Sequence, residues 1–111
     1  MLSVQDVVLD PQARRVWRGD RELELSRKEF DLLHALMRRA GDVVTRSELM
    51  LEVWNTGFWS SSKTIDVHLG WLRRKLGDDP RAPSLITTVR GVGLRFEDQS
   101  AAVGSAGPSL A

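Results

Sequence analysis

The 111-residue sequence predicts an α+β domain with an N-terminal antiparallel β-sheet, three helices and a C-terminal β-hairpin. Short alternating segments near the start predict the sheet. Two capping boxes and one amphipathic stripe then mark three helices. A β-branched segment punctuated by glycines follows them and predicts the hairpin. The length suits one domain with a core of its own.

The N-terminal strands are short and lie between turn-forming residues. Residues 7–10 and 14–18 are predicted strands on either side of a turn at residues 11–13. A second turn at residues 19–20 leads into residues 21–25, where polar and apolar side chains alternate. Such alternation is typical of a strand with one buried face and one solvated face. These segments predict a small antiparallel sheet.

Two capping boxes mark the starts of the first two helices. In each, the side chain of the first residue accepts a hydrogen bond from the amide three residues later, and the glutamate there bonds back to the first amide. Ser26 and Glu29 begin a helix that is predicted to end at Gly41, in a left-handed conformation. Thr45 and Glu48 begin a second, shorter helix.

The third helix, predicted over residues 63–77, has two dissimilar faces. One is an apolar stripe at helical spacing, made of Ile65, Leu69, Leu72 and Leu76. The outward face points away from this stripe and comprises Lys63, Val67, Gly70, Trp71 and Arg74. A merely solvated helix face would carry charges of both signs. Cations around small, apolar and aromatic side chains instead suit a helix laid in a DNA major groove.

A terminal hairpin is predicted from residues 85–89 and 94–97, with its turn supplied by Gly91 and Gly93. The order of sheet, three helices and hairpin is that of a winged helix-turn-helix. In that arrangement the third helix is the one that contacts bases and the hairpin is the wing.

Composition excludes several classes of protein. The chain has no Cys, which excludes disulfides and thiolate catalysis or metal binding. Because it has neither a long apolar run nor a signal-peptide pattern, we expect a cytoplasmic protein with no membrane partner. Ser, Ala and Gly predominate from residue 98 onward without periodicity. The predicted division is a folded domain at residues 1–97 and a disordered tail at residues 98–111.

Charge is segregated along the chain although the net charge is only +1. Residues 63–95 carry seven Lys or Arg against three Asp, which leaves +4 there and −3 elsewhere. A locally positive surface is what attraction to phosphates requires.

Four segments resemble the DNA-binding effector domain of OmpR/PhoB-type two-component response regulators. They are LSRKEFDLL at 25–33, VTRSEL at 44–49, TIDVHL with LRRKL at 64–76, and TVRGVG with RF at 88–96. They occur in the order and at the spacing of that family and cover about residues 7–97.

The resemblance implies that the third helix enters a major groove, that the wing reaches an adjacent minor groove, and that two copies bind direct repeats as a homodimer. The residues then predicted to contact double-stranded DNA are Lys63, Thr64, Val67, His68, Gly70, Trp71, Arg73 and Arg74 on the helix, and Thr88 and Arg90 on the wing. Gly70 and Trp71 replace polar or basic residues that often contact DNA in the family.

The resemblance also implies protein partners. The loop over residues 55–62 corresponds to a segment that touches RNA polymerase in the family, with Gly57, Phe58 and Trp59 at its centre. The family's domain normally follows a phosphoacceptor receiver domain that a sensor kinase controls. The chain is then either an excised domain or a domain that stands alone, and since no linker-like residues precede Leu2, we favour an excised domain.

Two other functional classes are weighed against DNA binding. For an enzyme, His34 and His68 lie on separate helices and have no metal-ligand spacing to carboxylates, so we predict no enzyme, metal or cofactor. The stronger alternative is a winged helix that binds protein, with Val67 and Trp71 as an apolar docking patch. His68 could be half-buried and structural, and Trp71 could belong to the core.

Overall fold

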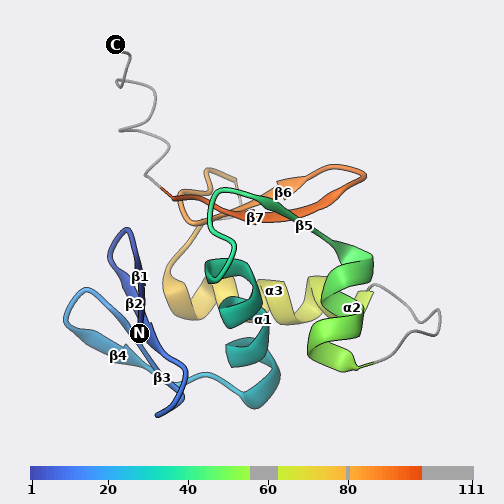
Figure 1. Cartoon of the computed structure of the whole chain (residues 1–111). Coiled ribbons are helices and arrows are strands. Elements are labelled where there is room, and N and C mark those ends of the chain that lie inside the picture. Colours follow the sequence, from blue (N-terminus) through green and yellow to red (C-terminus); the bar gives the residue numbers. More distant parts are fainter. Residues whose placement is uncertain (56–62, 80, 99–111) are drawn as a thin grey trace.

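The computed structural model describes residues 1–55, 63–79 and 81–98. It confirms the predicted order of a sheet, three helices and a terminal hairpin. In Figure 1 the N-terminal sheet lies at one end of the molecule, the helices lie in the middle, and a second sheet lies above them. Apart from Asp98, the predicted tail lies outside the described residues, so the predicted domain division stays a prediction.

The N-terminal sheet has four antiparallel strands in the order β1-β2-β3-β4. They are β1 (Leu2–Val4), β2 (Val7–Asp10), β3 (Arg15–Arg18) and β4 (Arg21–Leu23). Strand β1 was not predicted, because three residues are too few to show alternation. Strand β3 begins one residue later than predicted, after Arg14, whose φ is 55°. That left-handed conformation is incompatible with a strand. Strand β4 ends two residues earlier than predicted.

Both capping boxes are present in the helices α1 (Arg27–Met37) and α2 (Arg46–Trp54). The Glu29 carboxylate accepts from the Ser26 amide at 2.9 Å, and the Ser26 hydroxyl accepts from the Glu29 amide at 3.2 Å. Helix α1 ends before the predicted stop because the next residues form tighter i→i−3 hydrogen bonds. Gly41 follows with a φ of 92°, the left-handed conformation that was predicted for it.

Helix α3 (Lys63–Leu76) buries its predicted apolar stripe. The exposed fractions of Ile65, Leu72 and Leu76 are 0%, and that of Leu69 is 4%. Helix α1 packs against both α2 and α3 and supplies the centre of the core. Within residues 1–55, 63–79 and 81–98, we find no helix that is long and apolar enough to cross a bilayer.

The second sheet has three strands rather than the predicted two. Its antiparallel order is β5-β7-β6, made by β5 (Val43–Thr45), β6 (Ile86–Val89) and β7 (Gly93–Phe96). Strand β5 was missed because it is short and leads directly into α2. It ties the wing hairpin, β6 and β7, to the helical part of the molecule.

The prediction that Gly93 belongs to the wing turn was wrong. Gly91 makes the turn, with a φ of 76°, whereas Gly93 lies in β7 beside β5. A Cβ built on Gly93 would lie 2.0 Å from the carbonyl oxygen of Val44. Glycine is therefore required there for close strand packing rather than for turn geometry.

Candidate nucleic-acid interface

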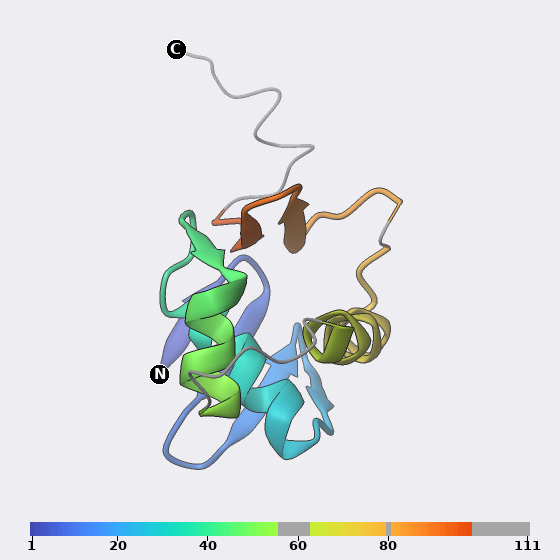
Figure 2. The same cartoon turned by 90° about the vertical axis from the view of Figure 1, so that its right-hand side faces the viewer.

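The outward face of α3 is exposed as predicted, beside the wing hairpin. Figure 2 looks almost along the axis of α3, which lies at one side of the molecule with the second sheet above it. Val67 is 45% exposed and Trp71 is 44% exposed. A Cβ built on Gly70 would meet nothing within 4 Å. The face is thus an accessible ridge with a gap at its middle.

The indole of Trp71 is exposed, but its neighbour His68 holds it in place. The His68 ring packs edge-on against Trp71 on one side and Trp54 of α2 on the other, with ring centroids 5.1 and 5.2 Å apart. His68 Nδ1 lies 2.8 Å from the carbonyl oxygen of Thr64, so in the tautomer that donates there, Nε2 remains for another partner. His68 is half-buried, and Trp71 does not belong to the core.

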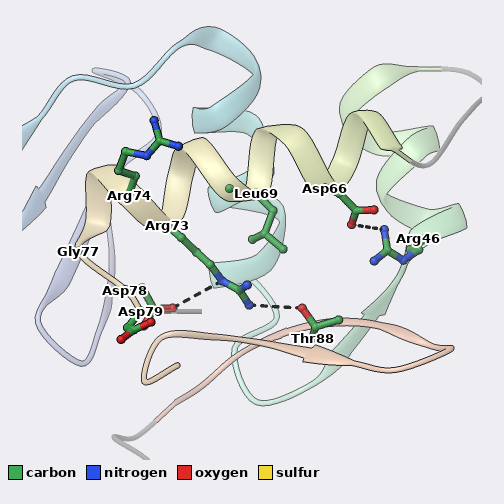
Figure 3. A pocket seen from close by; sticks show the side chains of 10 residues that line it. Arg46, Asp66, Leu69, Arg73, Arg74, Gly77, Asp78, Asp79 and Thr88 are labelled. Carbon is green, nitrogen blue, oxygen red and sulfur yellow. Dashed lines mark hydrogen bonds and ion pairs between the residues drawn. The ribbon is translucent and has the colours of Figure 1, made fainter. Parts of the chain in front are cut away.

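Three consecutive cations near the end of α3 lie in three different environments. Lys75 Nζ donates to Glu29 Oε1 of α1 at 2.7 Å. Arg73 points toward the wing, and Arg74 extends away from it (Figure 3). Within the part of the chain that the structure describes, the side chain of Arg74 has no hydrogen-bond or ion-pair partner. Of the three, Arg74 is the one available to a ligand.

Arg73 is engaged inside the protein. Its side chain is only 11% exposed, and Nη2 donates to the carbonyl oxygen of Ile86 at 2.7 Å and to Thr88 Oγ1 at 3.3 Å. Its Nε lies 3.9 Å from Asp78 Oδ2. Burial lowers the pKa of Arg73 from its ordinary value, against the opposing effect of Asp78. This guanidinium is thus already bound to the wing, and a DNA contact by Arg73 stays a prediction.

Among the described residues, the wing presents one cation without a hydrogen-bond or ion-pair partner. Arg90 lies in the exposed turn between β6 and β7, and among the described residues its side chain has no hydrogen-bond or ion-pair partner. The other cations of this region, Arg81 and Arg95, pair with nearby carboxylates. Thr88 is exposed on β6 and accepts a hydrogen bond from Arg73.

A groove of about 490 Å³ lies between α3 and the wing. Arg74 and Gly70 line one part of it, and Thr88 lines another. Arg46 at the start of α2 reaches Asp66 of α3 in an ion pair of 2.9 Å at the edge of the groove (Figure 3). The groove is therefore bordered by charges of both signs, and Arg90 of the wing does not line it.

The remaining predicted residues divide between this surface and the part that is not described. Lys63 and Thr64 form the first turn of α3, where Lys63 is exposed and Thr64 is half-buried. Gly57, Phe58 and Trp59, predicted to contact RNA polymerase, lie outside the described residues. In the described ranges, no group of three His, Cys, Asp or Glu side chains could hold a metal ion.

Two residues that contribute to this region were not identified from the sequence. Trp54 supports His68 from α2, and no local spacing connects the two. Asp78 is buried beneath the wing, with a 4% exposed fraction. Its position directly after the helix-ending Gly77 was a possible signal, because a carboxylate there can accept from the amides of a returning chain.

The sequence model described as "Transcriptional regulatory protein, C terminal" matches residues 20–96. The chain belongs to this family. This result confirms the resemblance to OmpR/PhoB-type response regulators, a family of transcriptional regulators and not of enzymes.

Two curated relatives are about equally similar to this chain in sequence. The chain is 45% identical over 96 residues to the alkaline phosphatase synthesis transcriptional regulatory protein SphR of Synechococcus elongatus. It is 44% identical over 95 residues to the transcriptional regulatory protein TcrA of Mycobacterium tuberculosis. Each alignment covers 86% of this chain and 37% of the relative, so the chain spans little more than a third of their length.

Two solved structures share the fold over nearly their whole length. The Klebsiella pneumoniae RstA DNA-binding domain, in complex with the RstA box, has a TM-score of 0.83 and 31% identity, covering 88% of this chain and 97% of that one. The DNA-binding domain of CpxR from E. coli has a TM-score of 0.79 and 33% identity, covering 89% and 97%. These similarities confirm the winged helix-turn-helix fold.

Proposed function

We propose that this domain binds double-stranded DNA sequence-specifically and thereby regulates transcription, with α3 in the major groove and the wing at an adjacent minor groove. The observation that carries the proposal is the outward face of α3, an exposed ridge beside the wing. The wing bears Arg90, which has no hydrogen-bond or ion-pair partner among the described residues. The structure of the RstA DNA-binding domain in complex with the RstA box supports this function, because that domain is 31% identical to this chain.

The proposed contacts divide by chemistry. Lys63, Arg74 and Arg90 are cations suited to phosphates, and Arg90 also suits a narrow minor groove. Val67, Gly70 and Trp71 present apolar surface to base edges such as a thymine methyl group. His68 Nε2, Thr64 and Thr88 can supply hydrogen bonds. The geometry of Arg73 favours a role within the protein.

Salt dependence tests the DNA-binding proposal. Fluorescence anisotropy of a labelled duplex should give a log affinity that falls linearly with log salt, by about 0.9 for each phosphate contacted. An affinity that does not change with salt concentration would overturn the proposal. It would favour the alternative of a protein-binding winged helix with Val67 and Trp71 as its patch, because burial of apolar surface depends weakly on salt.

Arg90→Ala sharpens the same test. Arg90 is exposed and unpaired among the described residues, so its removal should leave thermal unfolding unchanged. We expect cognate and unrelated duplexes to lose affinity by similar factors, with the salt slope smaller by about 0.9. Loss of the thermal transition would instead identify Arg90 as a structural residue.

We also propose that two copies bind direct repeats as a homodimer on DNA. This proposal rests on family membership. Selection of bound sequences from a random duplex pool should yield two similar half-sites in the same orientation, spaced by about one helical turn. A single half-site, or an inverted repeat, would contradict it. Mass measurement of the complex gives the stoichiometry independently.

In the full-length protein, we propose a receiver domain under a sensor kinase and a contact with RNA polymerase. Family membership supports both. Leu51 on α2 is an apolar side chain that is 57% exposed, which supports a protein contact in this part of the chain. Exchange of Phe58 and Trp59 for Ala should abolish activated transcription in vitro and leave DNA affinity unchanged. Equal loss of DNA affinity would contradict a separate polymerase contact.

A further inference from the structure

The connection between α3 and the wing is built around two charged residues, the buried Asp78 and the half-buried Arg73. Asp78 follows α3 directly, and its side chain is 0% exposed. Its Oδ1 accepts from the amides of Ser84 and Leu85 at 2.9 and 3.1 Å, and its Oδ2 accepts from the amide of Ile86 at 3.0 Å. One carboxylate thus fixes the backbone at the entry to β6 to the end of the helix.

Arg73 completes the connection from the helix itself. Its guanidinium donates to the carbonyl oxygen of Ile86, whose amide is bound by Asp78. It also donates to Thr88, two residues further along β6. The backbone amide of Asp78 in turn donates to the carbonyl oxygen of Arg73 at 2.8 Å. Arg73 and Asp78, the wing clamp, therefore hold both polar groups of one β6 residue.

We propose that the wing clamp is a positioning device: it fixes the wing to α3, so that major-groove and minor-groove contacts come from one rigid unit, and Arg73 does not contact DNA. The inference rests on the proposed DNA-binding function. A guanidinium that is 11% exposed and already makes two hydrogen bonds would have to break them to reach a phosphate. Its neighbour Arg74 is exposed and has no hydrogen-bond or ion-pair partner among the described residues, so it is under no such constraint.

The chemistry of Arg73 allows a test that separates positioning from contact. Lysine keeps the positive charge and most of the stem, so it preserves a simple phosphate contact. A single ammonium cannot place one nitrogen at Ile86 and Thr88 and a second one beside Asp78, as Nη2 and Nε of Arg73 do. Arg73→Lys should therefore loosen the clamp while leaving the charge near DNA unchanged. Arg74→Lys is the matched control on the adjacent, exposed position.

The experiment measures cognate-duplex affinity for wild type, Arg73→Lys, Arg90→Ala and the double variant. Effects of independent contacts multiply, whereas effects that depend on each other do not. If Arg90→Ala weakens wild type about tenfold, we expect it to weaken the Arg73→Lys protein less than about twofold, because a loosened wing has already lost its contact. Arg74→Lys should leave the full tenfold effect of Arg90→Ala in place.

Three outcomes would overturn the clamp. One is wild-type affinity of Arg73→Lys, and another is a full Arg90→Ala effect in its background. The third is stronger binding by Asp78→Asn, which is expected if the only effect of this change is to remove a negative charge near DNA. The clamp predicts weaker binding by Asp78→Asn and the same loss of the Arg90→Ala effect.

A DNA-free measurement separates this inference from the proposed function. Residual dipolar couplings of amides in α3 and in β6 report the relative orientation of the two elements. In Arg73→Lys the couplings of β6 should no longer fit one rigid unit with α3, while the thermal transition persists. Unchanged couplings would overturn the clamp even if the protein binds DNA. Altered couplings without any DNA binding would support the clamp and refute only the function.

Discussion

The two faces of α3 differ in what their polar side chains contact. On the protein-facing side, the cations near the helix end bind the wing through Arg73 and α1 through Lys75. On the outward face, Arg74 has no such partner among the described residues. Three adjacent side chains of the same charge thus have different roles. Position on the helix, more than residue type, therefore decides whether a cation stabilises the fold or remains for a ligand.

Gly93→Ala tests how the wing is attached to the rest of the protein, and we expect it to have the largest effect on stability. Its new Cβ would meet the Val44 carbonyl oxygen at 2.0 Å, so β5 and β7 must separate. We expect the free energy of unfolding in urea to fall by about 3 kcal/mol or more. Gly91→Ala is the control, because open space surrounds it and only its positive φ is strained. It should cost about 1 kcal/mol; equal losses would contradict the packing argument.

Glu29→Gln tests the pairing of Lys75 with α1. Glu29 is 3% exposed, and it caps α1 while accepting from Lys75. Burial raises the pKa of Glu29, but the hydrogen bonds from Lys75 and Ser26 outweigh it and hold the pKa below its ordinary value of 4.5. A depressed folded-state pKa stabilises the protein above pH 4.5, and this contribution disappears as the pH falls through the lowered pKa.

The expected result is a loss of about 1 to 3 kcal/mol at pH 7 for Glu29→Gln. The difference from wild type should shrink as the solution is acidified, because wild-type Glu29 then becomes protonated. Urea unfolding across a pH series measures both. Glu48→Gln is the control in the equivalent capping box of α2, where the side chain is 51% exposed and should matter less. A difference that does not depend on pH would exclude the charge of Glu29 as the cause.

Trp71→Ala moves the test to the outward face. The indole is 44% exposed and contacts His68, so stability should fall by no more than about 1 kcal/mol. Cognate DNA affinity should fall by about 1 to 3 kcal/mol if Trp71 contacts a base. Trp71→Arg should raise the salt slope by up to about 0.9 and shift the preferred base toward guanine. Melting of Trp71→Ala with unchanged DNA preference would show that the contact of Trp71 with His68 serves stability and that the indole does not contact bases.

Gly70→Ala should have the smallest effect on stability, and of the opposite sign. A Cβ there meets nothing within 4 Å, and alanine favours a helix over glycine by about 0.5 to 1 kcal/mol. The protein should become more stable while its affinity for cognate DNA falls, because the methyl group fills the gap where bases approach α3. Unchanged affinity would mean that DNA does not come close to the helix at this point.

Local features of the fold were predictable from the sequence. Both capping boxes, the buried stripe of α3 and the left-handed Gly41 follow from contacts between residues three or four apart, or from one backbone conformation. The exposure of Trp71 follows in the same way, from its helical phase relative to the stripe. Such features depend on short-range geometry, which a sequence carries directly.

The tertiary structure decided whatever depends on which distant surfaces meet. The sequence pattern assigned Gly93 to the wing turn, whereas the pairing of β7 with β5 makes it a site of close packing. The sequence likewise marked Arg73 and Lys75 as cations beside Arg74. Their partners Ile86 and Glu29 lie 13 and 46 residues away. Since a charge in the sequence does not specify its partner, only the packed chain could divide the cations that hold the wing and helices together from those that remain for DNA.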